Sequence, residues 1–261
     1  MLDKLNVASD IARKAGDIIM QYINIDKEIQ YKSNINLVTR ADQESEEYVC
    51  NALQKEYPED GILAEEGFRV ESKSGDTWVV DPLDGTTSFS HGFPCFAVSI
   101  ALVDKENQPV LAVVYNPFYN ELYSAIKGSG ATLNNKKIQV SDIKVMEKSL
   151  IGTGFPYTRK TEMELILQRL SRILYTVHDI RRTGAASLDL CYVACGRLEG
   201  YYETGLQPWD VAAGLLIVEE AGGRSSLFNG DSIDIHIPQT LASNGLIHNE
   251  FRNIVLGEEK Q

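Results

Sequence analysis

The segment WVVDPLDGTT, residues 78–87, places two carboxylates directly after a short apolar run. Its first three residues are aromatic or β-branched, which predicts a buried strand. Pro82 fixes φ and forces a turn, so Asp84 can return to the same side of the chain as Asp81. Gly85 removes a side chain where the backbone must approach another group closely. The segment therefore predicts a strand that ends in a pair of acidic side chains.

Two carboxylates beside main-chain amides suit a phosphate that is held through a metal ion. If a helix begins here, the amides of Gly85 and Thr86 face outward and can bind an anion. Hard oxygen ligands without a nearby His or Cys cluster favour Mg²⁺ or Mn²⁺ over zinc. A turn followed by a helix cap is the alternative for a single Asp-Gly pair. The combined pattern Asp-Pro-x-Asp-Gly-Thr favours the functional interpretation.

Composition excludes several classes of function. The chain has 261 residues, of which 43% are apolar and 24% charged, as in ordinary globular proteins. Its net charge of −12 and the lack of a basic stripe argue against direct binding of nucleic acid. The N-terminus lacks the apolar core of a signal peptide, and no apolar run is long enough to span a membrane. A cytoplasmic protein without a membrane partner is expected.

Hydrophobic periodicity outlines helices on both sides of a strand-rich region. Helices are expected over residues 2–22, from Thr39 to before Pro58, and over 162–174, 184–194 and 208–221. Strand-like runs lie at 78–80, 96–103, 110–115 and 121–125, which predicts an antiparallel meander. The polar stretch Asn134–Lys148 is the most plausible seam. Layers of helices and sheets are the expected architecture.

Further acidic residues stand at the ends of predicted elements. Glu65 and Glu66 follow an apolar stretch, and Asp210 opens a predicted helix. Each has a purely structural alternative, because a glutamate pair can be solvated and an aspartate can cap a helix. The same holds for Asp42, since Thr39-x-x-Asp42 also forms a good capping box.

Several blocks of the chain together resemble the inositol monophosphatase family. DPLDGTT at 81–87 with Phe89 and His91-Gly92 is similar to its first signature, and QPWDVAAG at 207–214 with EEAGG at 219–223 is similar to its second. LVTRAD at 37–42 and AEEG at 64–67 match two further blocks, and RRTGAASLDL at 181–190 resembles the bacterial members. The resemblance runs from the first helix to about Asn249.

This resemblance implies a layered αβαβα sandwich of the α+β or α/β class. It also implies one unit over residues 1–261, with an α+β metal-binding half at about 1–140 and an α/β half at about 141–261. In the same way it implies a homodimer and inhibition by Li⁺.

The resemblance also implies the ligands of two to three Mg²⁺ ions, with Mn²⁺ as a possible substitute. Glu65, Asp81 and the carbonyl of Leu83 would hold one ion. Asp81, Asp84 and Asp210 would hold a second, and a weaker third would lean on Glu65. The amides of Gly85 and Thr86 would bind the phosphate.

The remaining site residues are likewise implied by the resemblance. The Thr86 hydroxyl, linked to Asp42, would orient the attacking water, with Glu65 as a further catalytic residue. Substrate hydroxyls would contact Asp84, Ala186, Glu203 and Asp210. Lys32 matches a mobile-loop lysine. Two departures from the family pattern are Asn36, where many relatives have Asp, and Ser88, where Asn is usual.

The expected reaction is hydrolysis of inositol monophosphate to inositol and phosphate by in-line attack of a metal-activated water. A covalent aspartyl-phosphate route is disfavoured, because phosphatases of that type use Asp-x-Asp and the spacing here is three.

Two alternatives remain open. One is a broader phosphatase acting on fructose 1,6-bisphosphate, NADP or 3′-phosphoadenosine 5′-phosphate, although Thr87 in place of Lys favours the inositol branch. The other is a regulatory binding protein of the transcription machinery, for which Arg181-Arg182 would be an interface.

Overall fold

The computed structural model describes residues 1–23, 30–31 and 37–258, which form two large sheets, a two-stranded ribbon and the helices around them. The helices are α1 (Leu2–Gln21), α2 (Arg40–Glu56), α3 (Thr86–Ser90), α4 (Arg159–Leu174), α5 (Ala186–Ala194), α6 (Pro208–Glu220) and α7 (His248–Leu256), with a 3₁₀ turn η1 at Met146–Lys148. A two-stranded ribbon joins β1 (Gln30–Tyr31) to β2 (Leu37–Val38).

The larger sheet has eight strands in the order β10-β9-β8-β7-β6-β5-β3-β4. These are β3 (Gly61–Ala64), β4 (Arg69–Val70), β5 (Thr77–Asp84), β6 (Ala97–Val103), β7 (Pro109–Asn116), β8 (Glu121–Ile126), β9 (Gly130–Leu133) and β10 (Lys136–Lys137). From β5 to β10 each strand pairs antiparallel with the next, as expected for a meander. β3 runs parallel to β5, so the ends of β3 and β5 meet at one edge of the sheet.

The smaller sheet has five strands in the order β12-β11-β13-β15-β14. They are β11 (Leu150–Thr153), β12 (Asp179–Arg181), β13 (Gly200–Thr204), β14 (Arg224–Ser226) and β15 (Gln239–Ser243). β11 is parallel to both β12 and β13, whereas β15 pairs antiparallel with its neighbours. The chain passes from the larger to the smaller sheet through residues 138–149, which overlap the polar stretch noted at Asn134–Lys148 in all but the last residue.

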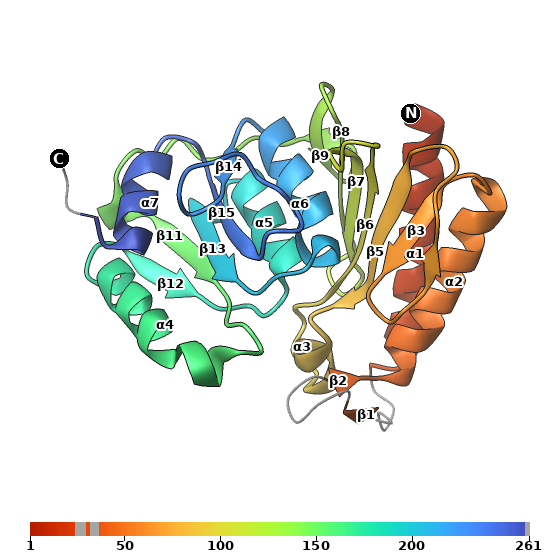
Figure 1. Cartoon of the computed structure of the whole chain (residues 1–261), viewed down its shortest axis with the longest axis horizontal. Helices are drawn as coiled ribbons and strands as arrows, with labels where there is room; N and C mark the ends of the chain where they lie inside the picture. Colours follow the sequence, from red (N-terminus) through yellow and green to blue (C-terminus); the bar gives the residue numbers. More distant parts are fainter. Residues whose placement is uncertain (24–29, 32–36, 259–261) are drawn as a thin grey trace.

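Helices and sheets alternate in layers (Figure 1). α1 and α2 cover one face of the larger sheet, α5 and α6 lie between the two sheets, and α4 and α7 cover the outer face of the smaller sheet. The expected αβαβα sandwich is therefore confirmed. Because α6 lies in the middle layer, nine of its 13 residues are buried, as expected of a helix that is apolar on nearly every side.

Strand β6 shows how the larger sheet is buried on both faces. All seven of its residues are buried. Ala97, Ala101 and Val103 pack in the cluster that contains the apolar residues of α5 and α6. Val98, Ile100 and Leu102 pack in the opposite cluster with α1 and α2. Successive residues pack in opposite clusters because side chains alternate between the two faces of a strand.

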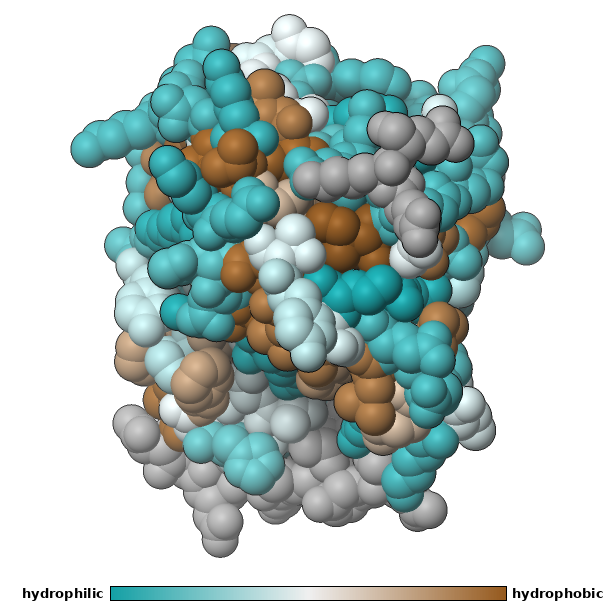
Figure 2. Space-filling view, turned by 90° about the vertical axis from the view of Figure 1, so that its left-hand side faces the viewer, coloured by the Kyte–Doolittle hydropathy of each residue, from teal (hydrophilic) through white to brown (hydrophobic). Residues whose placement is uncertain are grey.

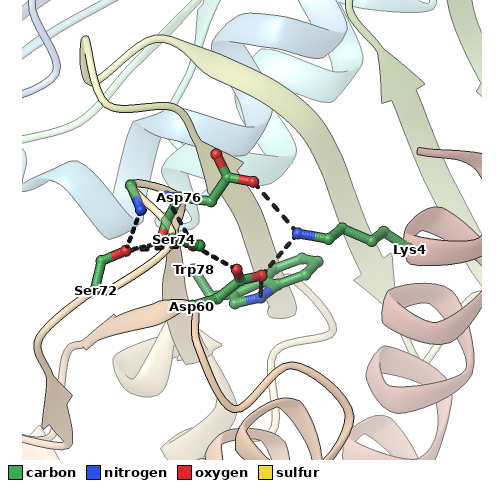
Figure 3. Close-up of polar contacts among 7 residues, drawn as sticks. Lys4, Asp60, Ser72, Ser74, Asp76 and Trp78 are labelled. Atoms are coloured by element: carbon green, nitrogen blue, oxygen red, sulfur yellow. Dashed lines mark hydrogen bonds and ion pairs between the residues drawn. The ribbon is translucent and has the colours of Figure 1, made fainter.

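A polar network fastens the first turns of α1 to the beginning of β5 (Figure 3). Lys4 Nζ lies 2.7 Å from Asp60 Oδ2 and 3.3 Å from Asp76 Oδ2. The indole of Trp78 donates to Asp60 Oδ2 at 3.1 Å. Asp60 and Trp78 are buried, so the bonds satisfy groups that would be costly to leave unpaired.

None of the helices in the described residues is at once long and apolar enough to cross a membrane.

Candidate active site

An irregularity in β5 sets the position of the two acidic residues of the central motif. Asp81 pairs with Ser99 and Asp84 with Ala97, so β5 carries one residue more than β6 across this interval. A bulge of this kind accommodates Pro82, which has no N–H to donate to the ladder. Its carbonyl accepts a hydrogen bond from Ser45 Oγ on α2 at 2.9 Å. Both carboxylates then line the same cleft.

Gly85 turns the chain from β5 into α3. Its φ of +90° is a left-handed conformation that favours glycine. A Cβ at this position would stand 2.6 Å from the carbonyl oxygen of Cys95, so the site also lacks room for a side chain. Thr86 is the first residue of α3, and both residues line the cleft. The helix that the sequence predicts after Gly85 is thus present, although it is only five residues long.

Two further carboxylates reach the cleft from other elements. Glu65 directly follows β3, and its amide continues the pairing with β5 by donating to the Val80 carbonyl at 3.1 Å. Asp210 stands in the first turn of α6, where its Oδ2 accepts the amide of Gln207 at 2.7 Å. The capping role considered for Asp210 is real, and it coexists with a place in the cleft.

The cleft has a volume of about 750 Å³ and concentrates negative charge. Desolvation raises the pKa of Asp81 well above its ordinary value, and the charges of Glu65, Asp84 and Asp210 raise it further. Desolvation, with Glu65 and Asp84 next, also raises the pKa of Asp210. The pKa of Asp84 rises to about 6 through desolvation, against hydrogen bonds from Ser187 and Ala186. Groups that disfavour ionisation together in this way are stabilised by a cation.

The hydrogen bonds of these carboxylates leave oxygens available to a metal. Asp81 Oδ1 accepts the Leu83 amide at 2.9 Å, and Asp84 Oδ2 accepts the amide and hydroxyl of Ser187 at 2.8 and 2.5 Å. In the described part of the chain, no Lys or Arg forms an ion pair with Asp81, Asp84 or Asp210. An all-oxygen donor set of this kind fits Mg²⁺.

The acidic side chains line one cleft but do not close on one point. Among residues 1–23, 30–31 and 37–258, no three His, Cys, Asp or Glu side chains are grouped tightly enough to hold a metal ion. Like charges repel one another, so a bound cation is what would bring these carboxylates together. The Leu83 carbonyl also borders the cleft and lies 3.1 Å from the Thr86 hydroxyl.

Asp42 and Thr86 are in direct contact. The Thr86 hydroxyl donates to Asp42 Oδ1 at 2.9 Å, although α2 and α3 are far apart in sequence. Asp42 Oδ2 accepts the amide and hydroxyl of Thr39, which completes the capping box of α2. Asp42 is fully buried, and desolvation raises its pKa to about 6 against these hydrogen bonds. The capping and the catalytic interpretations of Asp42 are therefore compatible.

The opposite wall of the cleft comes from α5 and the smaller sheet. Ala186 begins α5, and Glu203 lies in β13; both line the cleft, as Asp84 and Asp210 do. The Tyr201 hydroxyl donates to Glu203 Oε2. Desolvation raises the pKa of Glu203 to about 7. Of the site residues that the sequence predicts, Lys32 lies outside the described residues.

Sequence reasoning missed several residues of this wall. Ser187 holds Asp84 in place, and Asp189, Arg159 and Arg182 line the cleft. Asp189 is almost fully buried; Thr183 donates to its Oδ2 at 2.9 Å, and its Oδ1 has no hydrogen-bond partner. Asp189 and Arg182 belong to the block RRTGAASLDL, which the sequence analysis noted as a resemblance to bacterial members. The spacing within this block does not indicate what either residue does.

Comparisons with known proteins agree with this site. Residues 2–256 match the inositol monophosphatase family. The chain is 44% identical over 229 residues to the Nus factor SuhB of Vibrio cholerae, covering 87% of this chain and 85% of that protein. It is 40% identical over 249 residues to the inositol-1-monophosphatase of a Synechocystis species, covering 95% of this chain and 86% of that one.

Solved structures show the same similarity. The extragenic suppressor protein suhB of Bartonella henselae superimposes with a TM-score of 0.93 at 37% identity, covering 97% of this chain and 98% of that one. An inositol monophosphatase from Anabaena gives a TM-score of 0.90 at 36% identity, covering 99% and 97%. The match extends over the helices and both sheets that form the cleft. The chain belongs to the inositol monophosphatase family.

Proposed function

We propose that this protein is a Mg²⁺-dependent phosphomonoesterase that hydrolyses inositol monophosphate to inositol and phosphate. Membership of the family supports the class of reaction. The observation that carries the proposal is the convergence of four acidic side chains on one cleft, next to the amides of Gly85 and Thr86. The acidic residues are Glu65, Asp81, Asp84 and Asp210.

The carboxylates divide into two ligand sets in this proposal. Glu65, Asp81 and the carbonyl of Leu83 form the first set, and Asp81, Asp84 and Asp210 form the second, with Glu65 contributing to a weaker third. Bound metal, Mg²⁺ or in its place Mn²⁺, would supply Lewis acidity that favours ionisation of water and stabilises the leaving alkoxide. Ser187 supports the second set, because its amide and hydroxyl both hold one Asp84 oxygen in place.

Asp42 and Thr86 orient the attacking water. At pH 7 Asp42 is ionised, because its pKa is about 6. An ionised carboxylate accepts hydrogen bonds but cannot donate one. The Thr86 hydroxyl therefore points its proton at Asp42 or at the Leu83 carbonyl and presents its lone pairs to water. The amides of Gly85 and Thr86 would hold the phosphate in the path of that water.

The sugar ring would lie against the opposite wall. Ala186 and Glu203 line it, and Asp84 and Asp210 face it from the metal side. Carboxylates accept hydrogen bonds from hydroxyl groups, which is the chemistry that a polyol offers. The half of the cleft near Glu203 therefore suits a phosphorylated polyol or sugar.

A phosphate-release assay with a substrate panel tests this function. Inositol 1-phosphate, fructose 1,6-bisphosphate, NADP and 3′-phosphoadenosine 5′-phosphate should be compared at equal concentration with Mg²⁺. Inositol 1-phosphate is expected to be hydrolysed, and Li⁺ is expected to inhibit. Release of phosphate only from the other compounds would assign the broader phosphatase function instead.

A second candidate function is a regulatory binding protein of the transcription machinery, in the cytoplasm. It is favoured by relatives named Nus factor SuhB, from Vibrio cholerae and from Escherichia coli at 42% identity. The absence of phosphate release from every member of the panel would favour this function over the enzymatic one.

A homodimer is part of the proposal. Helix α4 lies on the outer face of the smaller sheet, and Figure 2 shows apolar side chains among polar ones on that side of the molecule. Met163, Leu167 and Leu174 on this helix are 45%, 51% and 54% exposed. The cores of homodimer interfaces are more apolar than the rest of a protein surface, so an exposed apolar row on one helix fits a subunit contact. Light scattering should give twice the mass of the 29.0 kDa chain, and a monomer at assay concentration would refute the dimer.

A further inference from the structure

Strand β13 carries a buried tyrosine next to the glutamate that lines the cleft. Tyr201 and Glu203 are two residues apart, so their side chains lie on the same face of the strand. Tyr201 is fully buried among the apolar residues of the middle layer, whereas Glu203 is partly exposed and lines the cleft. The Tyr201 hydroxyl donates to Glu203 Oε2. No function discussed so far uses this tyrosine.

The neighbouring strand leaves room for both side chains. β11 runs parallel to β13, and its Gly152 is paired with Tyr201. A Cβ at Gly152 would stand 3.1 Å from the Tyr201 ring. Two residues further along, a Cβ at Gly154 would collide with the carboxyl group of Glu203. The tyrosine and the glutamate therefore both lie against bare backbone, and a side chain at Gly154 would push the carboxyl group away.

Tyr201 can act only as a hydrogen-bond donor at this place. Desolvation, followed by the charges of Glu203 and Asp189, raises the pKa of Tyr201 well above its ordinary value. The hydroxyl therefore stays protonated, and in the part of the chain that the structure describes its acceptor is Glu203 Oε2. A buried tyrosine hydroxyl usually has a partner, so the bond by itself is compatible with a purely structural role.

The same bond favours the form of Glu203 that binds hydroxyl groups best. Desolvation raises the pKa of Glu203 to about 7, while the hydrogen bond from Tyr201 and the charge of Arg182 oppose the rise. The charge of Asp84 adds to the rise. Tyr201 thus stabilises the ionised carboxylate, and hydrogen bonds to an ionised acceptor are stronger than those to a neutral one. A substrate hydroxyl should therefore bind more tightly to a Glu203 that Tyr201 holds.

We propose that Tyr201 is a positioning residue, which holds the Glu203 carboxylate at the substrate wall of the cleft and thereby determines how well the enzyme discriminates for hydroxyl groups on the substrate. This inference rests on the proposed phosphatase function. Tyr201 is too deeply buried to touch the substrate, so its effect passes through Glu203. It acts on recognition of the hydroxyl groups and not on the phosphate.

A pair of substrates separates recognition of hydroxyl groups from the rest of the reaction. Inositol 1-phosphate carries ring hydroxyls, and phenyl phosphate is a phosphomonoester whose ring has none. The quantity measured is the ratio of kcat/KM for inositol 1-phosphate to that for phenyl phosphate, because a general loss of activity cancels in this ratio. Tyr201→Phe removes only the hydroxyl and should lower the ratio about tenfold, chiefly through KM for inositol 1-phosphate, as is usual for a lost hydrogen bond to a charged group.

A double-mutant cycle shows whether the effect passes through Glu203. Glu203→Ala should lower the ratio at least as much as Tyr201→Phe does. In the Glu203→Ala background, Tyr201→Phe should change the ratio no further. Gly154→Ala tests the same carboxylate from the neighbouring strand. The φ of Gly154 is not positive, so alanine fits the backbone and its Cβ meets Glu203; the ratio should fall here too.

Tyr123→Phe is the matched control. Tyr123 in β8 is also fully buried, and its hydroxyl donates at 2.9 Å to Glu121, which is likewise two residues away on the same strand. This pair does not line the cleft, so the ratio should stay at the wild-type value. Melting temperatures of the two phenylalanine variants show whether a difference in the ratio is separate from a difference in stability.

The outcomes separate this role of Tyr201 from the function on which it rests. The proposal is overturned by a wild-type ratio in Tyr201→Phe or in Gly154→Ala. It is also overturned if Tyr201→Phe lowers the ratio equally in the Glu203→Ala background, or if Tyr123→Phe lowers it as much. Each of these results leaves the phosphatase function standing, because the wild type still hydrolyses inositol 1-phosphate. Failure of the wild type to hydrolyse either compound overturns both.

Discussion

Asp84 shows how one side chain can serve both packing and chemistry. One of its oxygens accepts two hydrogen bonds from Ser187, which tie the end of β5 to the first turn of α5. The carboxylate thereby fixes the distance between two walls of the cleft. Its charge is needed only for the metal, so charge and shape can be separated by substitution.

Asp84→Asn should cripple catalysis and leave the fold intact. Asparagine keeps one oxygen for the Ser187 hydrogen bonds but is a poor Mg²⁺ ligand. Loss of several kcal/mol of transition-state stabilisation corresponds to a fall of at least about a thousandfold in kcat. The melting temperature of the metal-free protein should not fall, because one of the clustered negative charges is gone.

Asp104→Asn is the control for this substitution. Asp104 also accepts amides in a turn, from Glu106 and Gln108, but it lies outside the cleft. The Asp104→Asn variant should therefore retain the turnover of the wild type. Near-normal turnover of the Asp84 variant would mean that Asp84 is not a metal ligand and that it serves the turn alone.

At the scale of elements, the junction of β5 and α3 determines the geometry of the phosphate site. Gly85→Ala should destabilise the protein by about 2 kcal/mol or more, because a side chain is strained at positive φ and its Cβ would collide with the Cys95 carbonyl. Gly92→Ala, at φ of +72° but with open space around it, should cost only about 1 kcal/mol. Denaturant unfolding measures both values, and equal losses would show that the contact with Cys95 is unimportant.

Much of the larger sheet and its helices could be predicted from local pattern. The apolar period of α1 and the nearly continuous apolar runs of β6 and β7 are long enough to define their elements. The strands of the smaller sheet are too short for local pattern to define them. β13 and β15 have five residues each, and their pairing joins segments more than thirty residues apart, which no local pattern reports.

Some residues of the candidate site could likewise be predicted from the sequence, and others could not. Asp81 and Asp84 stand in one motif whose spacing alone suggests a metal, so they could be predicted. Ser187 gains its role, and Arg182 its place in the cleft, only when α5 and the end of β12 come to face β5. A serine in the first turn of a helix or an arginine just after a strand has an ordinary sequence context, and the fold supplies what distinguishes it.

At the scale of the whole molecule, the acidic cleft makes metal-free stability depend on pH. The folded-state pKa values of Asp42 and Asp84 are about 6 and that of Glu203 about 7, all above the ordinary values near 4. At a pH between the ordinary values and the folded-state values, these groups hold protons in the folded protein that they have released in the unfolded chain. The free energy of unfolding therefore falls as pH rises through this range. The metal-free melting temperature should therefore decline from pH 5 to pH 7.5.

Glu203→Gln provides the matched comparison for that decline. Glutamine carries no charge at any of these pH values, so the variant should lose less stability than the wild type over the same interval. Parallel curves for the two proteins would show that Glu203 titrates normally and that its position in the cleft does not disfavour its charge.

The requirement for metal tests the central claim most directly. Phosphate release from inositol 1-phosphate should be followed after metal is stripped from the protein with chelator and Mg²⁺ is then added back in steps. The account predicts no turnover before addition, a saturable recovery with Mg²⁺, and no recovery in Asp84→Asn over the same range. Full turnover of the wild type in chelator would contradict it.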